Sequence, residues 1–170
     1  SAFLQQHVPV YVVGGVVRDF FLGQKDKITD LDLVVEHSAI PLARQVADRL
    51  GWAFYPLDEL RDVARLVFTA NHGDPLVCDI ARQLGESIEH DLLLRDFTVN
   101  ALAFALKRPG QVELVDVCHG QADLQARLIR RVSAASLADD PVRLLRAIRF
   151  AVQLNFALDE QTRLQIKRTC

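Results

Sequence analysis

The chain has 170 residues, of which half are hydrophobic, and its formal net charge is −2. Such a composition is typical of a globular protein and excludes a disordered one. No segment approaches the ~18 consecutive apolar residues that a membrane-spanning helix requires, and the first residues lack the basic start of a secretory signal. Cys78, Cys118 and Cys170 are too few and too far apart for a disulfide framework or a zinc site. We therefore expect a cytoplasmic protein that makes no membrane contact.

Charge is distributed unevenly along the chain. Residues 1–124 contain 11 Lys or Arg and 18 Asp or Glu, whereas residues 125–170 contain 9 and 4. The basic segment favours contact with a polyanion, although a solvated helix face would give the same excess.

The first half of the chain predicts strands mixed with helices. Apolar residues predict strands over 8–13, 30–35, 52–57, 63–69 and 76–80, with a hairpin-like turn at 71–74. A helix is expected over 15–22, ended by Gly23, and a second over 38–50, capped by Ser38 and ended by Gly51.

The second half changes character near residue 135. Before it we expect a helix over 86–94, an ambiguous apolar run over 97–106, a strand over 111–117 and a short helix over 119–126. No strand pattern follows Val132, and Asp140 opens an amphipathic helix that runs to about 154, with another from about Asp159. We therefore divide the chain into an α/β catalytic domain (1–135) and a helical extension (136–170). The helical pattern is unfinished at the end, so we expect a truncated domain.

The residues with chemical potential begin at a glycine pair. Gly14 and Gly15 separate a strand from a helix, and backbone amides in such a turn can hold phosphate oxygens. Arg18 follows in the first helical turn. Asp30 and Asp32 point to one face of the next strand, about 6.6 Å apart at their Cα atoms. Their apolar neighbours predict a mostly buried strand, in which unpaired carboxylates are costly. The combination predicts metal-dependent nucleotidyl transfer, and exposed positions on an edge strand are the alternative.

Four motifs, in order and spacing, resemble the class II tRNA nucleotidyltransferases, which comprise CCA-adding, CC-adding and A-adding enzymes and poly(A) polymerases. They are Gly14-Gly15-Val-Val-Arg18-Asp19, Asp30-Leu-Asp32, Arg95-Asp96-Phe97-Thr98-Val99-Asn100-Ala101 and Asp139-Asp140-Pro-Val-Arg143-Leu-Leu-Arg146-Ala-Ile-Arg149-Phe150. The resemblance covers essentially the whole chain. It implies a mixed α/β head domain of the polymerase-beta-like fold, followed by the start of a helical neck.

The resemblance also implies roles for the motif residues. Asp30 and Asp32 would hold two Mg²⁺ ions, and Gly14, Gly15 and Arg18 would hold the triphosphate. Arg95, Asp96 and Asn100 would contact the nucleotide sugar and phosphates, although Asp96 and Asn100 could instead cap helices. Asp79 is either a third acidic group beside the metal pair or a cap at the end of its strand.

Asp140 and Arg143 correspond to the base-reading motif of the family. A carboxylate and a guanidinium on one helix face can pair with the amino group and ring nitrogen of cytosine or adenine. Asp140 before Pro141 is also a favourable helix N-cap. Arg146 and Arg149 would add phosphate contacts or remain solvated on the helix. We place Phe97, Phe104 and Phe150 in the core.

Two departures from the family pattern bear on specificity. Leu94 stands where the family usually has a first arginine, and residues 80–91 form a short connection where many members have a longer flexible loop. The short connection resembles the CC-adding subgroup, which transfers CMP from CTP to the 3′ end of tRNA and releases pyrophosphate. The alternatives are an A-adding or CCA-adding enzyme or a poly(A) polymerase that uses ATP, a small-molecule nucleotidyltransferase, and a non-catalytic nucleotide- or RNA-binding module.

Overall fold

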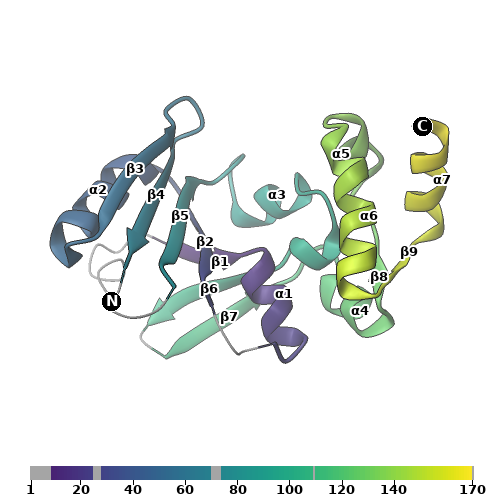
Figure 1. Cartoon of the computed structure of the whole chain (residues 1–170), viewed down its shortest axis with the longest axis horizontal. Coiled ribbons are helices and arrows are strands. Elements are labelled where there is room, and N and C mark those ends of the chain that lie inside the picture. Colours follow the sequence, from purple (N-terminus) through teal and green to yellow (C-terminus); the bar gives the residue numbers. More distant parts are fainter. Residues whose placement is uncertain (1–8, 25–27, 70–73, 109, 170) are drawn as a thin grey trace.

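The computed structural model describes residues 9–24, 28–69, 74–108 and 110–169. Seven of its strands form one mixed sheet, and the helices of the C-terminal part are gathered beyond one end of it (Figure 1). The strands are β1 (Val10–Val13), β2 (Asp30–Val35), β3 (Ala53–Asp58), β4 (Val63–Phe68), β5 (Leu76–Arg82), β6 (Ala103–Arg108) and β7 (Gln111–Val115). Their order in the sheet is β3-β4-β5-β2-β1-β6-β7. β2 and β5 run parallel, and the other neighbours run antiparallel.

The helices lie between and after these strands. They are α1 (Gly15–Phe21), α2 (Ala39–Leu50), α3 (Ile88–Leu93), the 3-10 turn η2 (Thr98–Asn100), α4 (Gly120–Ala126), α5 (Ala134–Ala138), α6 (Val142–Leu154) and α7 (Glu160–Thr169). The ambiguous run 97–106 therefore divides into η2 and β6. The predicted strand start at Val8 and residues 71–73 of the predicted turn lie outside the described residues.

The two faces of the sheet carry different side chains because residues alternate along each strand. On one face, Leu33, Leu66 and Ile80 pack in a core with residues of α2. On the other face, Val13 and Val34 pack with residues of α3. Asp30 and Asp32 have the same parity as Val34, so they lie on the face that α3 partly covers.

The N-terminus of α2 is capped by a residue that the sequence did not predict. Ser38 has a φ of 58° and its side chain makes no capping hydrogen bond. Instead, the carboxylate of Asp62 accepts hydrogen bonds from the backbone amides of Ala39 and Ile40, at 2.9 and 2.8 Å. The predicted Ser38 cap is therefore wrong, because a carboxylate from the β3–β4 turn satisfies these amides and faces the positive end of the helix dipole.

Another core includes residues from both sides of position 135. Val17 and Phe97 pack there with Leu137, Leu144 and Phe150. A two-stranded parallel sheet of β8 (Leu128–Ile129) and β9 (Ala157–Leu158) also crosses this position, so the expectation of no strand after Val132 is wrong. The division at residue 135 stays a prediction.

Other sequence expectations can be compared directly with the structure. Phe97 and Phe150 are buried as predicted, and Phe104 is partly buried against Phe20 and Phe21. Cys78 and Cys118 are free thiols, and burial raises the pKa of Cys78 to about 12. Cys170 lies outside the described residues. Within the described ranges, the helices are all too short or too polar to cross a membrane, and the cytoplasmic location stays a prediction.

Candidate active site

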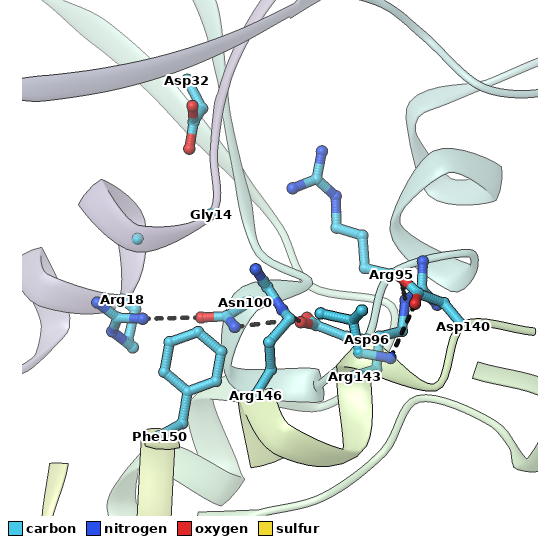
Figure 2. Close-up of a pocket in the computed structure, with 12 residues that line it drawn as sticks. Gly14, Arg18, Asp32, Arg95, Asp96, Asn100, Asp140, Arg143, Arg146 and Phe150 are labelled. Atoms are coloured by element: carbon cyan, nitrogen blue, oxygen red, sulfur yellow. Dashed lines mark hydrogen bonds and ion pairs between the residues drawn. The ribbon is translucent and has the colours of Figure 1, made fainter. Parts of the chain in front are cut away.

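A cavity of about 540 Å³ opens between the turn after β1, the start of β2, the segment 95–100 and helix α6 (Figure 2). Most of the residues that the motifs predicted line it. They are Gly14, Gly15, Arg18, Asp32, Arg95, Asp96, Asn100, Asp140, Arg143 and Arg146, together with Val142 and Phe150. The four motifs, far apart in the sequence, therefore converge on one cavity.

The glycine turn passes close to one of the carboxylates. Gly14 has a φ of +74°, and a Cβ atom there would lie 3.4 Å from Oδ2 of Asp32 and 3.7 Å from Nη1 of Arg95. Glycine suits this position because it adopts the left-handed conformation without steric cost and leaves space beside Asp32. The Gly14 amide already donates a long hydrogen bond of 3.4 Å to the Leu102 carbonyl.

Asp30 and Asp32 lie at the open end of β2. Both are exposed, whereas the later β2 residues Leu33 and Val34 are buried, so the expectation that the carboxylates are buried is wrong. Asp32 opens to the cavity on one side only. Burial by the protein around its other sides is the largest effect that raises the pKa of Asp32, and the nearby Asp79 carboxylate raises this pKa further. The Arg95 guanidinium lowers it in part. A bound cation would relieve this unfavourable charge.

Asp79 lies beside Asp32, where the two face each other in the parallel ladder of β2 and β5. Its strand continues to Arg82, so the alternative that it caps a strand end is wrong. Both of its carboxylate oxygens accept hydrogen bonds from Arg65 on β4, at 2.8 and 2.9 Å. No sequence pattern indicates a role for Arg65, because only the strand register brings it beside Asp79.

A chain of hydrogen bonds connects α1, η2 and α6 along one wall of the cavity (Figure 2). Arg18 donates to Oδ1 of Asn100 at 2.9 Å, and Nδ2 of Asn100 donates to Oδ1 of Asp96 at 3.4 Å. Arg146 donates to Oδ2 of Asp96 at 2.7 Å. Asp96 and Asn100 are buried and make no helix-capping bond at η2, so the capping alternative for them is wrong.

Arg95 is held by a second acidic residue that sequence reasoning missed. Its Nε and Nη2 atoms donate to Oδ2 of Asp91 on α3, at 3.1 and 2.9 Å. The other oxygen of Asp91 accepts from the backbone amide of Leu84. The spacing of four residues on a helix turn is the only sequence pattern that could have indicated this pair.

Helix α6 supplies the wall opposite the sheet. Oδ1 of Asp140 accepts from the Val142 amide at 2.9 Å and so caps the first amide of α6, but the N-cap position of this helix is Pro141 and not Asp140 as predicted. Oδ2 of Asp140 lies 3.9 Å from Nε of Arg143. Arg143 also donates to the carbonyls of Ser136 and Leu94. Phe150, predicted only as a core residue, is also a wall of the cavity.

Arginines surround the Phe150 ring. Arg18, Arg146 and Arg149 have their guanidinium carbons 5.1–5.5 Å from its centroid. Arg149 is exposed on the helix, and neither it, Asp30 nor Asp79 is among the cavity-lining residues.

Two carboxylates are available for a metal ion. Among the described residues, no group of three or more His, Cys, Asp or Glu side chains is arranged to hold one. Asp79 is paired with Arg65, which leaves Asp30 and Asp32 on the same face of β2. Mg²⁺ is commonly bound by one or two carboxylates together with water and substrate phosphates. The residues therefore fit an ion that binds jointly with a nucleotide.

A mixed sheet with paired carboxylates beside a glycine turn, and with arginines around the cavity, fits the polymerase-beta-like fold that the sequence motifs implied. A family model described as the poly A polymerase head domain matches residues 10–130. The chain belongs to this family, which confirms the family and the fold class predicted from the sequence.

Several proteins similar to this chain are named as enzymes that act on tRNA. A CC-adding tRNA nucleotidyltransferase of Synechocystis sp. is 47% identical over 152 residues, which cover 89% of this chain and 35% of that protein. An A-adding tRNA nucleotidyltransferase of Aquifex aeolicus is 37% identical over 166 residues, which cover 93% of this chain and 20% of that protein. The chain thus spans about a third of the Synechocystis relative and a fifth of the Aquifex one.

Solved structures agree with these relatives. A CCA-adding enzyme in complex with ATP superposes with a TM-score of 0.86 at 35% identity, covering 98% of this chain and 40% of the other. A Thermotoga maritima CCA-adding enzyme complexed with tRNA gives a TM-score of 0.85 at 36% identity, covering 98% and 39%.

Proposed function

We propose that this chain is the catalytic part of a Mg²⁺-dependent tRNA 3′-end nucleotidyltransferase that adds cytidines from CTP. The observation that carries the proposal is the cavity of about 540 Å³, in which the glycine turn, Asp32 and the base-reading residues Asp140 and Arg143 meet. The relatives that add nucleotides to tRNA, and the related structures with CTP, ATP or tRNA, support the substrate class.

The residues divide into three groups around a bound nucleotide. Gly14, Gly15 and Arg18 hold the triphosphate at one end of the cavity, and Arg95 contributes charge beside Asp32. Asp96 and Asn100 contact the ribose. A cation held by Asp30 and Asp32 would help to deprotonate the attacking 3′-hydroxyl and would stabilise the charge on the leaving pyrophosphate.

Asp140 and Arg143 distinguish the bases. Oδ1 of Asp140 caps α6, so Oδ2 is the oxygen that can accept a hydrogen bond from the amino group of cytosine. Arg143 supplies a donor for the ring nitrogen beside that group. Uracil and guanine present a carbonyl where the carboxylate requires a donor, and the site therefore rejects them. Arg146 and Arg149 add positive charge for RNA phosphates.

The connection between β5 and α3 favours cytidine over adenosine addition. Residues 83–87 form this connection, and they are fixed at several points: Gln83 donates from its amide to the Val35 carbonyl at 2.7 Å, and Leu84 donates to Asp91 at 3.0 Å. Ser87 caps α3 through the His90 amide. A loop fixed in this way cannot move so as to change the shape of the cavity from one that accepts cytosine to one that accepts adenine. The 47% identical CC-adding relative supports the same choice.

The specificity is tested with the complete protein and a tRNA that ends before its CCA. With CTP and ATP supplied together, products should be extended by two residues, and a tRNA that already ends in two cytidines should accept no adenosine. Efficient extension by three residues would contradict the CC-adding assignment and favour the alternative that the A-adding relatives suggest. Those relatives are 35–38% identical where they match over most of the chain.

A further inference from the structure

One face of β3 and β4 is left open next to the catalytic carboxylates. On the opposite face, Leu66 and the ring of Phe54 belong to the core formed with α2. Figure 1 shows α2 behind these strands, and no helix of the described part of the chain crosses their front. This open face is therefore available to a ligand that approaches the carboxylates from the side of β3.

The open face carries a row of side chains in strand register. Tyr55 on β3 faces Arg65 on β4, Arg65 faces Asp79 on β5, and Asp79 faces Asp32 on β2. Tyr55 is 52% exposed, although tyrosine rings usually pack against neighbours in sheets. At the ordinary spacing between strands, three steps place β3 about 14 Å from β2. The row thus extends from the metal-binding carboxylates to an exposed aromatic ring.

The geometry of the reaction indicates what must arrive along this row. In nucleotidyl transfer the attacking and leaving oxygens lie roughly in line. The glycine turn that holds the triphosphate follows β1, on one side of β2, and β5 lies on the other side. The attacking 3′-hydroxyl must therefore reach Asp32 from the side of β5, which is the side of Arg65 and Tyr55.

We propose that Tyr55 and Arg65 form a stacking platform for the unpaired 3′-terminal nucleotides of the RNA primer, an inference that rests on the proposed function. Arg65 is neutralised by its two hydrogen bonds to Asp79, so its contribution is a flat guanidinium surface and not attraction for phosphate. Single-stranded RNA bases stack on aromatic rings and on guanidinium planes. The terminal base lies over the Arg65–Asp79 pair, and the preceding base lies on Tyr55.

The first test compares Tyr55→Ala and Tyr55→Phe in the complete protein. The alanine variant should raise the KM for tRNA roughly tenfold, the lower part of the range for loss of one base–aromatic stack, and should leave the KM for CTP unchanged. The phenylalanine variant should behave as the parent because it keeps the ring. Val112→Ala, at an exposed position on the far edge strand β7, is the matched control.

Primers that lack one base separate stacking from a structural role. Two tRNAs are used, with an abasic nucleotide at the last or at the preceding position. The penalty of Tyr55→Ala should disappear for the primer that is abasic at the preceding position, because there is then no base to stack on Tyr55, and should persist for the primer that is abasic at the last position. An equal penalty on both abasic primers, or no penalty on the intact tRNA, overturns the platform. If the parent protein adds no nucleotide to any tRNA, the proposed function itself has failed, and the two failures are thereby distinguished.

Discussion

Asp30 and Asp32 differ from Asp79 in the partners that the fold gives them. Asp79 has both oxygens bound by Arg65, which compensates its charge within the protein. Asp30 receives a hydrogen bond from the Thr29 hydroxyl, and Asp32 lies near Arg95, whose guanidinium donates its hydrogen bonds to Asp91. The first two carboxylates therefore keep oxygen atoms for a cation, whereas the third sets the electrostatic environment of Asp32.

Replacing either available carboxylate should abolish transfer. Asp30→Asn or Asp32→Asn should lower nucleotide incorporation by a factor of at least about 100, because a two-metal mechanism has no other ligand at that position. Isothermal titration with Mg²⁺ in the presence of CTP should show weaker metal binding. Asp48→Asn, an exposed position on α2, is the control for loss of one negative charge. Near-normal incorporation by a folded Asp32→Asn variant would refute the metal assignment.

The two residues that we propose to read the base, Asp140 and Arg143, also have structural partners within the protein. Asp140→Ala combined with Arg143→Ala should slow the use of CTP and relax the rejection of UTP and GTP, by about 1–3 kcal/mol of discrimination per lost contact. Competition assays with the four nucleotides measure this. Thermal unfolding must accompany them, since loss of the Asp140 cap alone costs about 1 kcal/mol. Unchanged preference in a folded double variant would leave Asp140 as a cap and Arg143 as a brace for the Ser136 carbonyl.

At the scale of secondary structure elements, the sequence predicted the strands, helices and helix ends that a local pattern of residues determines. The strands β1 to β5 and the helices α2 and α6 were expected from apolar periodicity, and Gly51 ends α2 in the left-handed conformation as predicted. Contacts between distant segments were not predictable in this way. The capping of α2 by Asp62, the Arg65–Asp79 pair and the short β8–β9 ladder all depend on residues brought together by tertiary structure.

The same distinction holds in the candidate site. The sequence predicted ten residues that line the cavity, because each belongs to one of the motifs that the chain shares with its family. It missed Asp91, which holds Arg95, and it treated Phe150 only as a core residue. Positions that support other residues carry no chemical pattern of their own, so only the fold identifies them.

The cap of α2 offers a direct test of one such distant contact. Asp62→Ala should lower the free energy of unfolding by about 1–2 kcal/mol, because two helix amides lose their acceptor and alanine is strained at a φ of 54°. Asp62→Asn should lose less, since asparagine keeps an acceptor and tolerates this conformation. Urea unfolding of both variants measures the difference. Equal losses in the two variants would show that charge alone, and not the hydrogen bonds, carries the effect.

At the scale of the whole molecule, one arginine connects the sheet domain to the C-terminal helices. Arg130 donates from Nε to Asp123 on α4 and from Nη1 to Asp159, which precedes α7, at 3.0 and 2.8 Å. Asp123 also accepts from the hydroxyl of Thr98, in the turn that carries Asn100. The core around Phe97 and Phe150 lies in the same region. Segments on both sides of residue 135 are thus joined by polar contacts as well as by apolar packing.

This arrangement predicts that the segments on both sides of residue 135 unfold together and that their stability depends on Arg130. Arg130→Met should lower the free energy of unfolding by about 2 kcal/mol, because the largely buried carboxylates of Asp123 and Asp159 lose their shared partner. The loss should be smaller than for a fully buried ion pair, since the arginine itself is half-exposed. Arg130→Lys should fall between the variant and the parent, since one ammonium keeps the charge but cannot reach both carboxylates with a planar fork. Calorimetry should show a single transition that shifts as a whole. Two separate transitions, of which only one moves in Arg130→Met, would show instead that the segments on either side of residue 135 are independent folding units.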